Sequence, residues 1–253
     1  VNAANIEKDL KWIRGYKANF DVEIKDLSQD TSILALQGPL AQEILQKLTD
    51  TDLSFIKFFY FKKNLSINGV SAMISRTGYT GEDGFEIFID NKDAIRVWND
   101  ILKAGKSEGL KPAGLGCRDT LRFEASLPLY GQEVSPEISP LEAGFKFFVK
   151  PNKESAFIGQ DVLKKQWDGD LERTLVGFQL LGRGIPREGY EIYKDGEKIG
   201  HVTTGYMSPT LKKSIGNALI LISEKELDNE IDVMIRNRAV KAKIIDRNFL
   251  KNK

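Results

Sequence analysis

The sequence has only one cysteine and one histidine in 253 residues, Cys117 and His201. A single cysteine excludes an internal disulfide, and for a chain of this size we expect a reducing compartment, the cytoplasm. The same scarcity excludes a zinc site built from His and Cys ligands, so we expect no metal centre. We interpret His201 as a structural residue of a strand and Cys117 as a small buried residue near a helix start.

Long apolar runs and an excess of one charge are also missing. No run approaches the roughly 20 apolar residues that cross a bilayer. Lys and Arg number 37 against 36 Asp and Glu, whereas proteins that bind nucleic-acid phosphates carry a large positive excess. No G-x-S-x-G elbow, P-loop or G-x-G-x-x-G fingerprint is present. We therefore expect neither a membrane nor a nucleic-acid partner.

The chain begins at Val1, and its first residues resemble neither a signal peptide nor a transit peptide. Apolar residues recur at helical spacing over 6–13, directly behind the N-cap types Asn2 and Asn5. A helix this early is typical of the interior of a longer protein, so we expect further residues before Val1.

The first part of the chain mixes the two kinds of periodicity. Alternation of apolar and polar residues predicts strands, and apolar residues three and four apart predict helices. The expected strands are 20–27, 31–36, two runs within 55–74 that flank the turn Asn68-Gly69, and 85–89. The expected helices are one after Pro39 with Ala41, Ile44, Leu45 and Leu48 buried, one over 93–104 with Ile95, Trp98, Ile101 and Leu102 inward, and one over 117–125. The aromatic cluster 58–61 is interpreted as core.

The last part of the chain is dominated by short strands. They are expected at 174–180, 190–194, 198–203, 215–222, 231–235 and 240–245, with Asp195-Gly196 as a type I′ turn. A linker near 150–172 holds one short helix around 159–166. We predict an α+β protein: an α/β region at residues 1–150, then a small antiparallel β-barrel or jelly-roll-like domain at residues 151–253.

The segment SRTGYTGEDGFEIF, residues 75–88, places three glycines between two expected strands. Three glycines so close together permit a tight turn and the close approach of a ligand to the backbone. The alternative is an ordinary turn that carries acidic side chains and binds nothing. Glu86 alternates with Phe85 and Ile87, so its side chain is expected on the opposite face of the strand. A carboxylate there can accept two parallel hydrogen bonds from an amino-pyrimidine edge, the edge that a pterin presents.

Several longer motifs run in order along the chain. They are RTGYTGEDGFE at 76–86, GLGCRDTLRFEASLPLYGQE at 114–133 and SPLEAGFKFFVK at 139–150, extended by NAANIEKDL at 2–10, LQGPLAQ at 36–42 and GYMSPTLKKSIGNALI at 205–220. Together they resemble the aminomethyltransferase family of the glycine cleavage system, the T-protein family, over nearly the whole chain.

The resemblance implies transfer of a methylene group from an aminomethyl-dihydrolipoyl arm, carried by lipoylated H-protein, to tetrahydrofolate, with release of ammonia. It implies that Glu86 binds the pterin edge, that Arg118 is a second folate contact, and that Tyr79 and Asn2 help to line the pocket.

Arg118 is also a reasonable ligand contact on its own chemistry. It stands near an expected helix start, where a planar guanidinium can donate to ligand oxygens. An ion pair with Glu82 or Glu124 is the alternative.

Two departures from the family pattern bear on catalysis. The family carries a further segment before the equivalent of Val1, with the aspartate assigned to activating the folate nitrogen, and an arginine near its C-terminus at the folate site. Here the chain ends FLKNK, and Arg247 is its last arginine. We expect the catalytic residue upstream of Val1, this chain alone to be inactive, and a separate N-terminal segment as a candidate partner.

A folate-binding module without transferase activity is the alternative function. The folate-binding proteins of iron–sulfur maturation share part of the pattern, but their K-G-C-[FY]-x-G-Q-[ED] run is here SLPLYGQE. The C-terminal part of sarcosine and dimethylglycine dehydrogenases is fused behind a flavin domain, whose fingerprint is absent from this sequence. A third hypothesis is a two-domain protein whose glycine-rich loop is purely structural.

Overall fold

The chain forms two compact units, Val1–Gly114 and Leu115–Lys253. The structure, a computed structural model, describes residues 1–250, with the side chain of Asn19 excepted. No helix within that range has the length and apolar character needed to cross a membrane.

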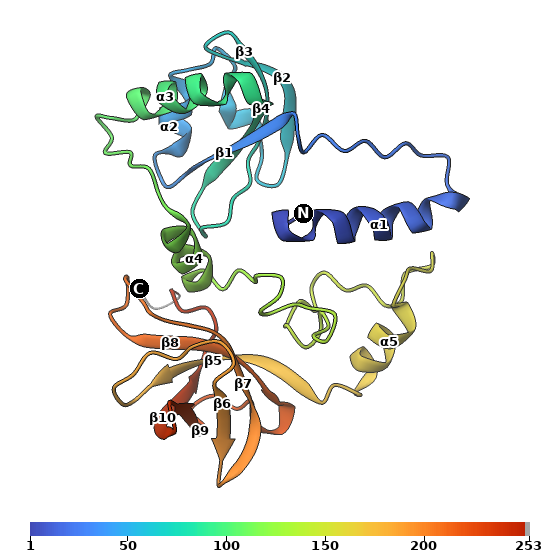
Figure 1. Cartoon of the computed structure of the whole chain (residues 1–253), viewed down its shortest axis with the longest axis vertical. Coiled ribbons are helices and arrows are strands. Elements are labelled where there is room, and N and C mark those ends of the chain that lie inside the picture. Colours follow the sequence, from blue (N-terminus) through green and yellow to red (C-terminus); the bar gives the residue numbers. More distant parts are fainter. Residues whose placement is uncertain (251–253) are drawn as a thin grey trace. The chain divides into compact units, whose positions relative to one another are not determined.

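The first unit is built on a four-stranded antiparallel sheet with two helices on one face (Figure 1). Its strand order is β1-β4-β3-β2, which leaves β1 and β2 at the edges. The elements are β1 (Thr31–Gln37), α2 (Ala41–Gln46), η3 (Leu53–Phe55), β2 (Phe61–Ile67), β3 (Val70–Ser75), β4 (Gly84–Asp90), η4 (Asn91–Asp93) and α3 (Ala94–Ala104). The strands expected at 31–36, within 55–74 and at 85–89 are therefore confirmed.

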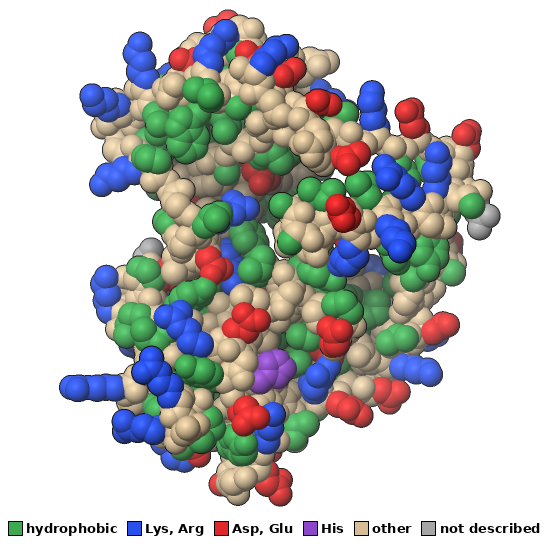
Figure 2. Space-filling model, viewed as in Figure 1, with side chains coloured by type: hydrophobic (Ala, Val, Ile, Leu, Met, Phe, Trp, Pro, Cys, Tyr) green, Lys and Arg blue, Asp and Glu red, His purple; other side chains and the backbone are tan. Residues whose placement is uncertain are grey.

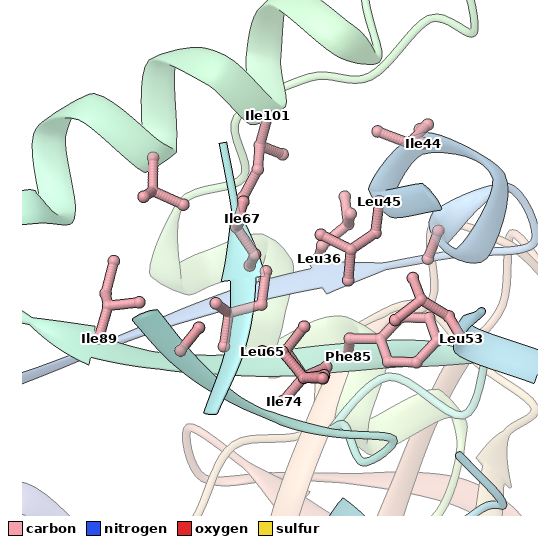
Figure 3. Close-up of a cluster of buried hydrophobic side chains, with 14 of the residues drawn as sticks. Leu36, Ile44, Leu45, Leu53, Leu65, Ile67, Ile74, Phe85, Ile89 and Ile101 are labelled. Carbon is pink, nitrogen blue, oxygen red and sulfur yellow. The ribbon is translucent and has the colours of Figure 1, made fainter. Parts of the chain in front are cut away.

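Period-two alternation decides which strand residues enter the core. On β4, Phe85, Ile87 and Ile89 are buried while the residues between them are not, as a strand with one covered face requires. Figure 3 shows Phe85 and Ile89 in the cluster of buried side chains that also contains Ile44 of α2 and Ile101 of α3. Glu86 therefore lies on the face of the sheet opposite the helices, as predicted.

The turn between β2 and β3 follows from two residues that tolerate positive φ. Asn68 has φ 45° and Gly69 has φ 79°, the combination that a type I′ hairpin requires. The turn therefore fixes the register of β2 against β3, with Ile67 opposite Val70.

The N-terminal helix is confirmed, but the strand expected after it is wrong. Helix α1 (Ile6–Tyr16) follows η1 (Ala3–Asn5) and continues into η2 (Lys17–Asn19). Residues 20–27 are irregular, and Phe20 and Val22 are 67% and 49% exposed. Alternation makes a strand only where another strand offers its backbone groups, and within residues 1–250 none pairs with this segment.

Helix α3 buries only part of the expected stripe: Ile101 is buried and Leu102 is half-buried as expected, but Ile95 and Trp98 are not buried. Val97 and Ile101 are buried, whereas Ile95 is 77% and Trp98 is 40% exposed. Figure 2 shows hydrophobic side chains on the surface over α3. The helix has two adjacent apolar stripes, one with Ile95 and Trp98 and one with Val97 and Ile101. The second stripe packs against the sheet, and its ends are the small residues Ala94 and Ala104.

The aromatic cluster 58–61 is not core. Its four side chains are 56% to 73% exposed, because the core positions beside them are taken by Leu53 and Ile56. Phe59 has φ 66°, an uncommon backbone conformation for a bulky residue. Its backbone is held there by a hydrogen bond from Phe59 N–H to the carbonyl of Arg76.

The second unit contains the expected barrel. Six antiparallel strands close in the order β10-β5-β8-β7-β6-β9 around a core that includes Phe178, Ile192 and Val233 (Figure 1). The elements are α4 (Leu115–Glu124), α5 (Gln160–Asp168), β5 (Arg173–Leu180), β6 (Glu191–Lys194), β7 (Glu197–Met207), β8 (Ser214–Leu221), η5 (Ile222–Glu224), β9 (Glu230–Ile235) and β10 (Arg238–Ile245). The α+β fold class with a C-terminal antiparallel barrel is confirmed.

Two single residues of this unit complete the comparison. His201 lies on β7, where burial, and then the charges of Arg173 and Lys198, lower its pKa. Cys117 is exposed on α4, so its interpretation as a buried residue is wrong. The first turn of α4 lies at the surface, and only its last residues, such as Phe123, enter the core.

Candidate functional site

Glu86 stands half-buried on the outer face of β4, next to two hydroxyl residues. Thr77 donates a hydrogen bond from Oγ1 to Glu86 Oε2 at 2.5 Å. Ser75 is the residue directly opposite Glu86 across the β3–β4 pair, and its hydroxyl lies 3.0 Å from that of Thr77. The carboxylate is therefore held on one side, while three of its four lone-pair positions remain for other donors.

The loop that carries Thr77, residues 76–83, is closed at its base by a planar ion pair. Arg76 donates from Nε to Asp83 Oδ1 at 2.9 Å and from one terminal nitrogen to Oδ2 at 2.6 Å. Its other terminal nitrogen reaches the carbonyl of Ile56 at 3.2 Å. The guanidinium holds the pKa of Asp83 below its usual value, and the pair fixes both ends of the loop.

Two glycines, Gly78 in the loop and Gly84 at the start of β4, make room for Gln37 rather than for a ligand. A Cβ at Gly78 would overlap the Gln37 amide, and one at Gly84 would lie 2.6 Å from it. The Gln37 amide donates to the carbonyls of Thr77 and Phe85 at 3.1 Å and 3.3 Å. Gly81, with φ 79°, supplies the turn itself. The glycine pattern thus shapes a loop locked onto the end of β1.

In the second unit, a buried ion pair anchors α4. Arg122 and Glu133 have no exposed side-chain surface and lie 2.8 Å apart. Arg122 also donates to Asp119 at 2.7 Å and to Gln132 at 2.6 Å. Glu133 accepts from the Thr203 hydroxyl of β7 at 3.0 Å. This network joins α4, the 131–133 turn and the barrel wall.

Other polar contacts tie α4 to the barrel at two further points. The Tyr206 hydroxyl donates to Asp119, and burial together with this hydrogen bond raises the pKa of Tyr206 to about 12. Glu124 accepts from Thr210 Oγ1 at 2.6 Å and from the Ser208 hydroxyl. Glu124 is therefore committed to the barrel loop, which disfavours its suggested ion pair with Arg118.

The four residues predicted to bind the ligand fall in both units. Glu86, Tyr79 and Asn2 belong to the first unit, and Arg118 belongs to the second. Tyr79 is half-buried in the 76–83 loop, and Asn2 is exposed just before η1. Arg118 is exposed on the first turn of α4, one helical turn before Arg122.

A hollow of the first unit lies away from these residues. A cavity of about 670 Å³, open to solvent, separates α1 from the outer face of the sheet. It is lined by apolar residues that include Leu10, Ile33 and Phe88, and by none of Asn2, Tyr79 and Glu86. Within residues 1–250, no three His, Cys, Asp or Glu side chains are grouped to hold a metal ion.

Two family models match the chain, one on each side of the linker. Residues 1–153 match the GCVT N-terminal domain, and residues 173–251 match the glycine cleavage T-protein C-terminal barrel domain. The chain belongs to the glycine cleavage T-protein family. The second match coincides with the six-stranded barrel, and the first contains Glu86 and its loop.

Relatives named aminomethyltransferase align with almost the whole chain. The one from Thermoanaerobacter pseudethanolicus is 61% identical over 99% of this chain and 68% of its own length. The one from Geobacillus sp. is 58% identical over 99% of this chain and 69% of its own length. The chain thus spans about two thirds of these T-proteins.

A solved T-protein has the same fold. The crystal structure of glycine cleavage system aminomethyltransferase T from Bartonella henselae is 26% identical and superposes with a TM-score of 0.88. The match covers all of this chain and 68% of that chain.

The sequence did not indicate the residues that support the predicted contacts. Thr77 donates a hydrogen bond to Glu86, and Gln37 donates one to the backbone of the loop. Arg122 donates a hydrogen bond to Thr204 of β7 and so holds α4 against the barrel. The one available signal was the pair of hydroxyl residues, Ser75 and Thr77, at the end of an expected strand that precedes the Glu86 strand.

Proposed function

We propose that this chain carries the tetrahydrofolate-binding part of the transferase reaction of glycine cleavage. The methylene carbon of the aminomethyl group loses its bonds to sulfur and to the departing ammonia. It gains two bonds to nitrogens of tetrahydrofolate, giving 5,10-methylenetetrahydrofolate and a dihydrolipoyl thiol. The observation that supports this proposal most strongly is the Glu86 carboxylate, fixed on the outward face of β4 within the motif RTGYTGEDGFE at 76–86.

Glu86 suits the pterin edge by its acceptor capacity. An ionised carboxylate accepts but does not donate, and the amino-pyrimidine edge offers two parallel N–H donors. One lone pair of Oε2 is used by Thr77, so both oxygens keep acceptor positions for this edge.

Arg118, Tyr79 and Asn2 are proposed as the further folate contacts. The exposed guanidinium of Arg118 can donate to carboxylate or carbonyl oxygens of the ligand. Tyr79 belongs to the same loop as Thr77, whose hydroxyl donates to Glu86. Asn2 lies directly before η1, which leads into α1.

We propose lipoylated H-protein as the donor of the aminomethyl group, and the cytoplasm as the compartment because the chain has one cysteine. The group that activates the folate nitrogen is proposed to lie outside residues 1–253, with a separate N-terminal segment as a candidate partner. We also propose a functional division at residue 150, into a folate-binding domain at 1–150 and a barrel domain at 151–253. The interval between the two family matches, 154–172, supports this division, although the compact units meet at residue 114.

Turnover tests the proposal. The protein expressed from its complete gene is mixed with aminomethylated H-protein and tetrahydrofolate, and methylenetetrahydrofolate and ammonia are measured. We expect the two products in equal amounts, and a large loss of both in Glu86→Ala. Tetrahydrofolate binding without either product would instead support the folate-binding module.

A further inference from the structure

A chain of hydroxyl groups ends on the Glu86 carboxylate. Thr77 Oγ1 lies 2.5 Å from Glu86 Oε2 and 3.0 Å from Ser75 Oγ. An ionised carboxylate has no proton to give, so the single hydroxyl proton of Thr77 points to Glu86. Ser75 must then donate to Thr77. The hydrogen bonds are therefore all donated in the same direction, from Ser75 to Thr77 and from Thr77 to Glu86.

The position of Thr77 is fixed by contacts of its backbone and of its neighbour. The Thr77 carbonyl accepts a hydrogen bond from Gln37 Nε2 at 3.1 Å, and Arg76 is fixed by its two hydrogen bonds to Asp83. Gln37 fills the space above Gly78, so the loop has little freedom to move Thr77 away from β4. The donor is thus pre-organised by contacts that do not involve Glu86.

Glu86 needs such a donor because its terminal torsion is soft. Rotation of a glutamate carboxylate about its last bond has a broad energy profile, so an unrestrained group presents its two oxygens in many planes. Two parallel hydrogen bonds to a planar ligand require one plane. A fixed donor on Oε2 lowers the cost of ordering the carboxylate when the ligand binds.

We propose that Thr77 is the positioning residue that orients the Glu86 carboxylate toward a reduced pterin. The inference rests on the proposed role of Glu86 in folate binding. Thr77 does not contact the reacting carbon in this scheme, and it acts only through Glu86.

The test compares Thr77→Val, which replaces the hydroxyl by a methyl group of similar size, with Thr77→Ser, which keeps the hydroxyl. Both are made in the protein expressed from its complete gene, and tetrahydrofolate affinity is measured by calorimetry. Because a hydrogen bond to a charged group is lost, we expect Thr77→Val to bind roughly 10-fold more weakly. Thr77→Ser should remain close to wild type. The matched control is Thr80→Val, in the same loop, whose hydroxyl contacts Gln37 at 3.4 Å; its affinity should not change.

A double-mutant cycle separates positioning from a general effect on the loop. The value of kcat/KM for tetrahydrofolate is measured for Thr77→Val alone and on the Glu86→Ala background. Positioning through Glu86 predicts that the second substitution adds no further loss on that background. An equal loss on both backgrounds, or failure of Thr77→Ser to restore affinity, would overturn the inference.

The two proposals fail in different ways. If Glu86→Ala binds tetrahydrofolate as tightly as wild type, the proposed role of Glu86 is wrong, and the role of Thr77 falls with it. If Glu86→Ala weakens binding while Thr77→Val does not, only the positioning role is refuted.

Discussion

Replacing Arg122 by methionine should destabilise the second unit strongly, because the substitution leaves buried charge without its counterion. Arg122 has no exposed side-chain surface, and its carboxylate partner Glu133 has none either. Breaking a buried ion pair by removing one partner costs about 3–5 kcal/mol. Glu133 would retain the Thr203 hydroxyl and the Leu129 N–H as donors, at 3.0 Å each. Asp119 is 30% exposed and can reach water. We therefore expect the low end of this range, about 3 kcal/mol.

Urea unfolding measures this loss. With a slope of about 3 kcal/mol/M, the expected change lowers the unfolding midpoint of the second unit by about 1 M. Amide hydrogen exchange should locate the effect in α4 and β7, which the network joins. Lys198→Met is the control, because its ion pair with Glu191 is about half exposed on both sides, and its midpoint should not move. An Arg122→Met midpoint equal to that of wild type would refute the view that this ion pair anchors α4.

Three further predictions concern stability. Phe58→Ser should change the unfolding free energy by less than about 0.5 kcal/mol, because the Phe58 ring is 56% exposed. Phe85→Ala, at a fully buried ring, should cost about 3–5 kcal/mol. Equal losses of the two variants in denaturant titrations would contradict the exposed placement of Phe58. Gly196→Ala should cost about 1 kcal/mol in the same titrations because Gly196 has φ 86° in the β6–β7 turn, and an unchanged midpoint would contradict that turn. Arg76 holds the folded-state pKa of Asp83 below 3.8, so its stabilisation is complete above that pH and is lost as the pH falls through the lowered pKa. The decline of the urea midpoint in acid should therefore be shallower in Asp83→Asn than in wild type, and identical profiles would exclude this contribution.

The barrel was predictable because its signals are local. Each strand from 174–180 onward shows apolar residues bounded by turn residues, and Asp195-Gly196 takes the two positive φ values that a type I′ turn demands. The outward direction of Glu86 was predictable for the same reason, since it follows from alternation with Phe85 and Ile87.

The errors arose where a partner element decides the outcome. Residues 20–27 alternate like a strand, yet no strand in the described part of the chain pairs with them. Helix α3 has two adjacent apolar stripes, and only its contact with the sheet shows that Val97, not Trp98, is buried. The aromatic cluster 58–61 has the composition of a core, but Leu53 and Ile56 fill that place.

The supporting residues of the site were hidden for a related reason. Thr77 meets Glu86 only in the observed β3–β4 register, and Gln37 reaches the loop across the β1–β4 pair. Arg122 and Thr204 are 82 positions apart in sequence. The spacing of residues along the sequence carries no information on such contacts. The resemblance of the motifs indicated which residues bind the ligand, but not which residues orient those side chains.

The central claim, that the Glu86 carboxylate binds the pterin edge of tetrahydrofolate, is tested most directly by calorimetric titration of wild type and Glu86→Ala, each expressed from the complete gene. Loss of a charged acceptor leaves two ligand donors unpaired at a cost of at least about 1.5 kcal/mol each, so the affinity should fall by about 100-fold or more. The urea midpoint should stay near that of wild type, because Glu86 lies outside the core. Unchanged affinity in a folded Glu86→Ala protein would contradict the claim.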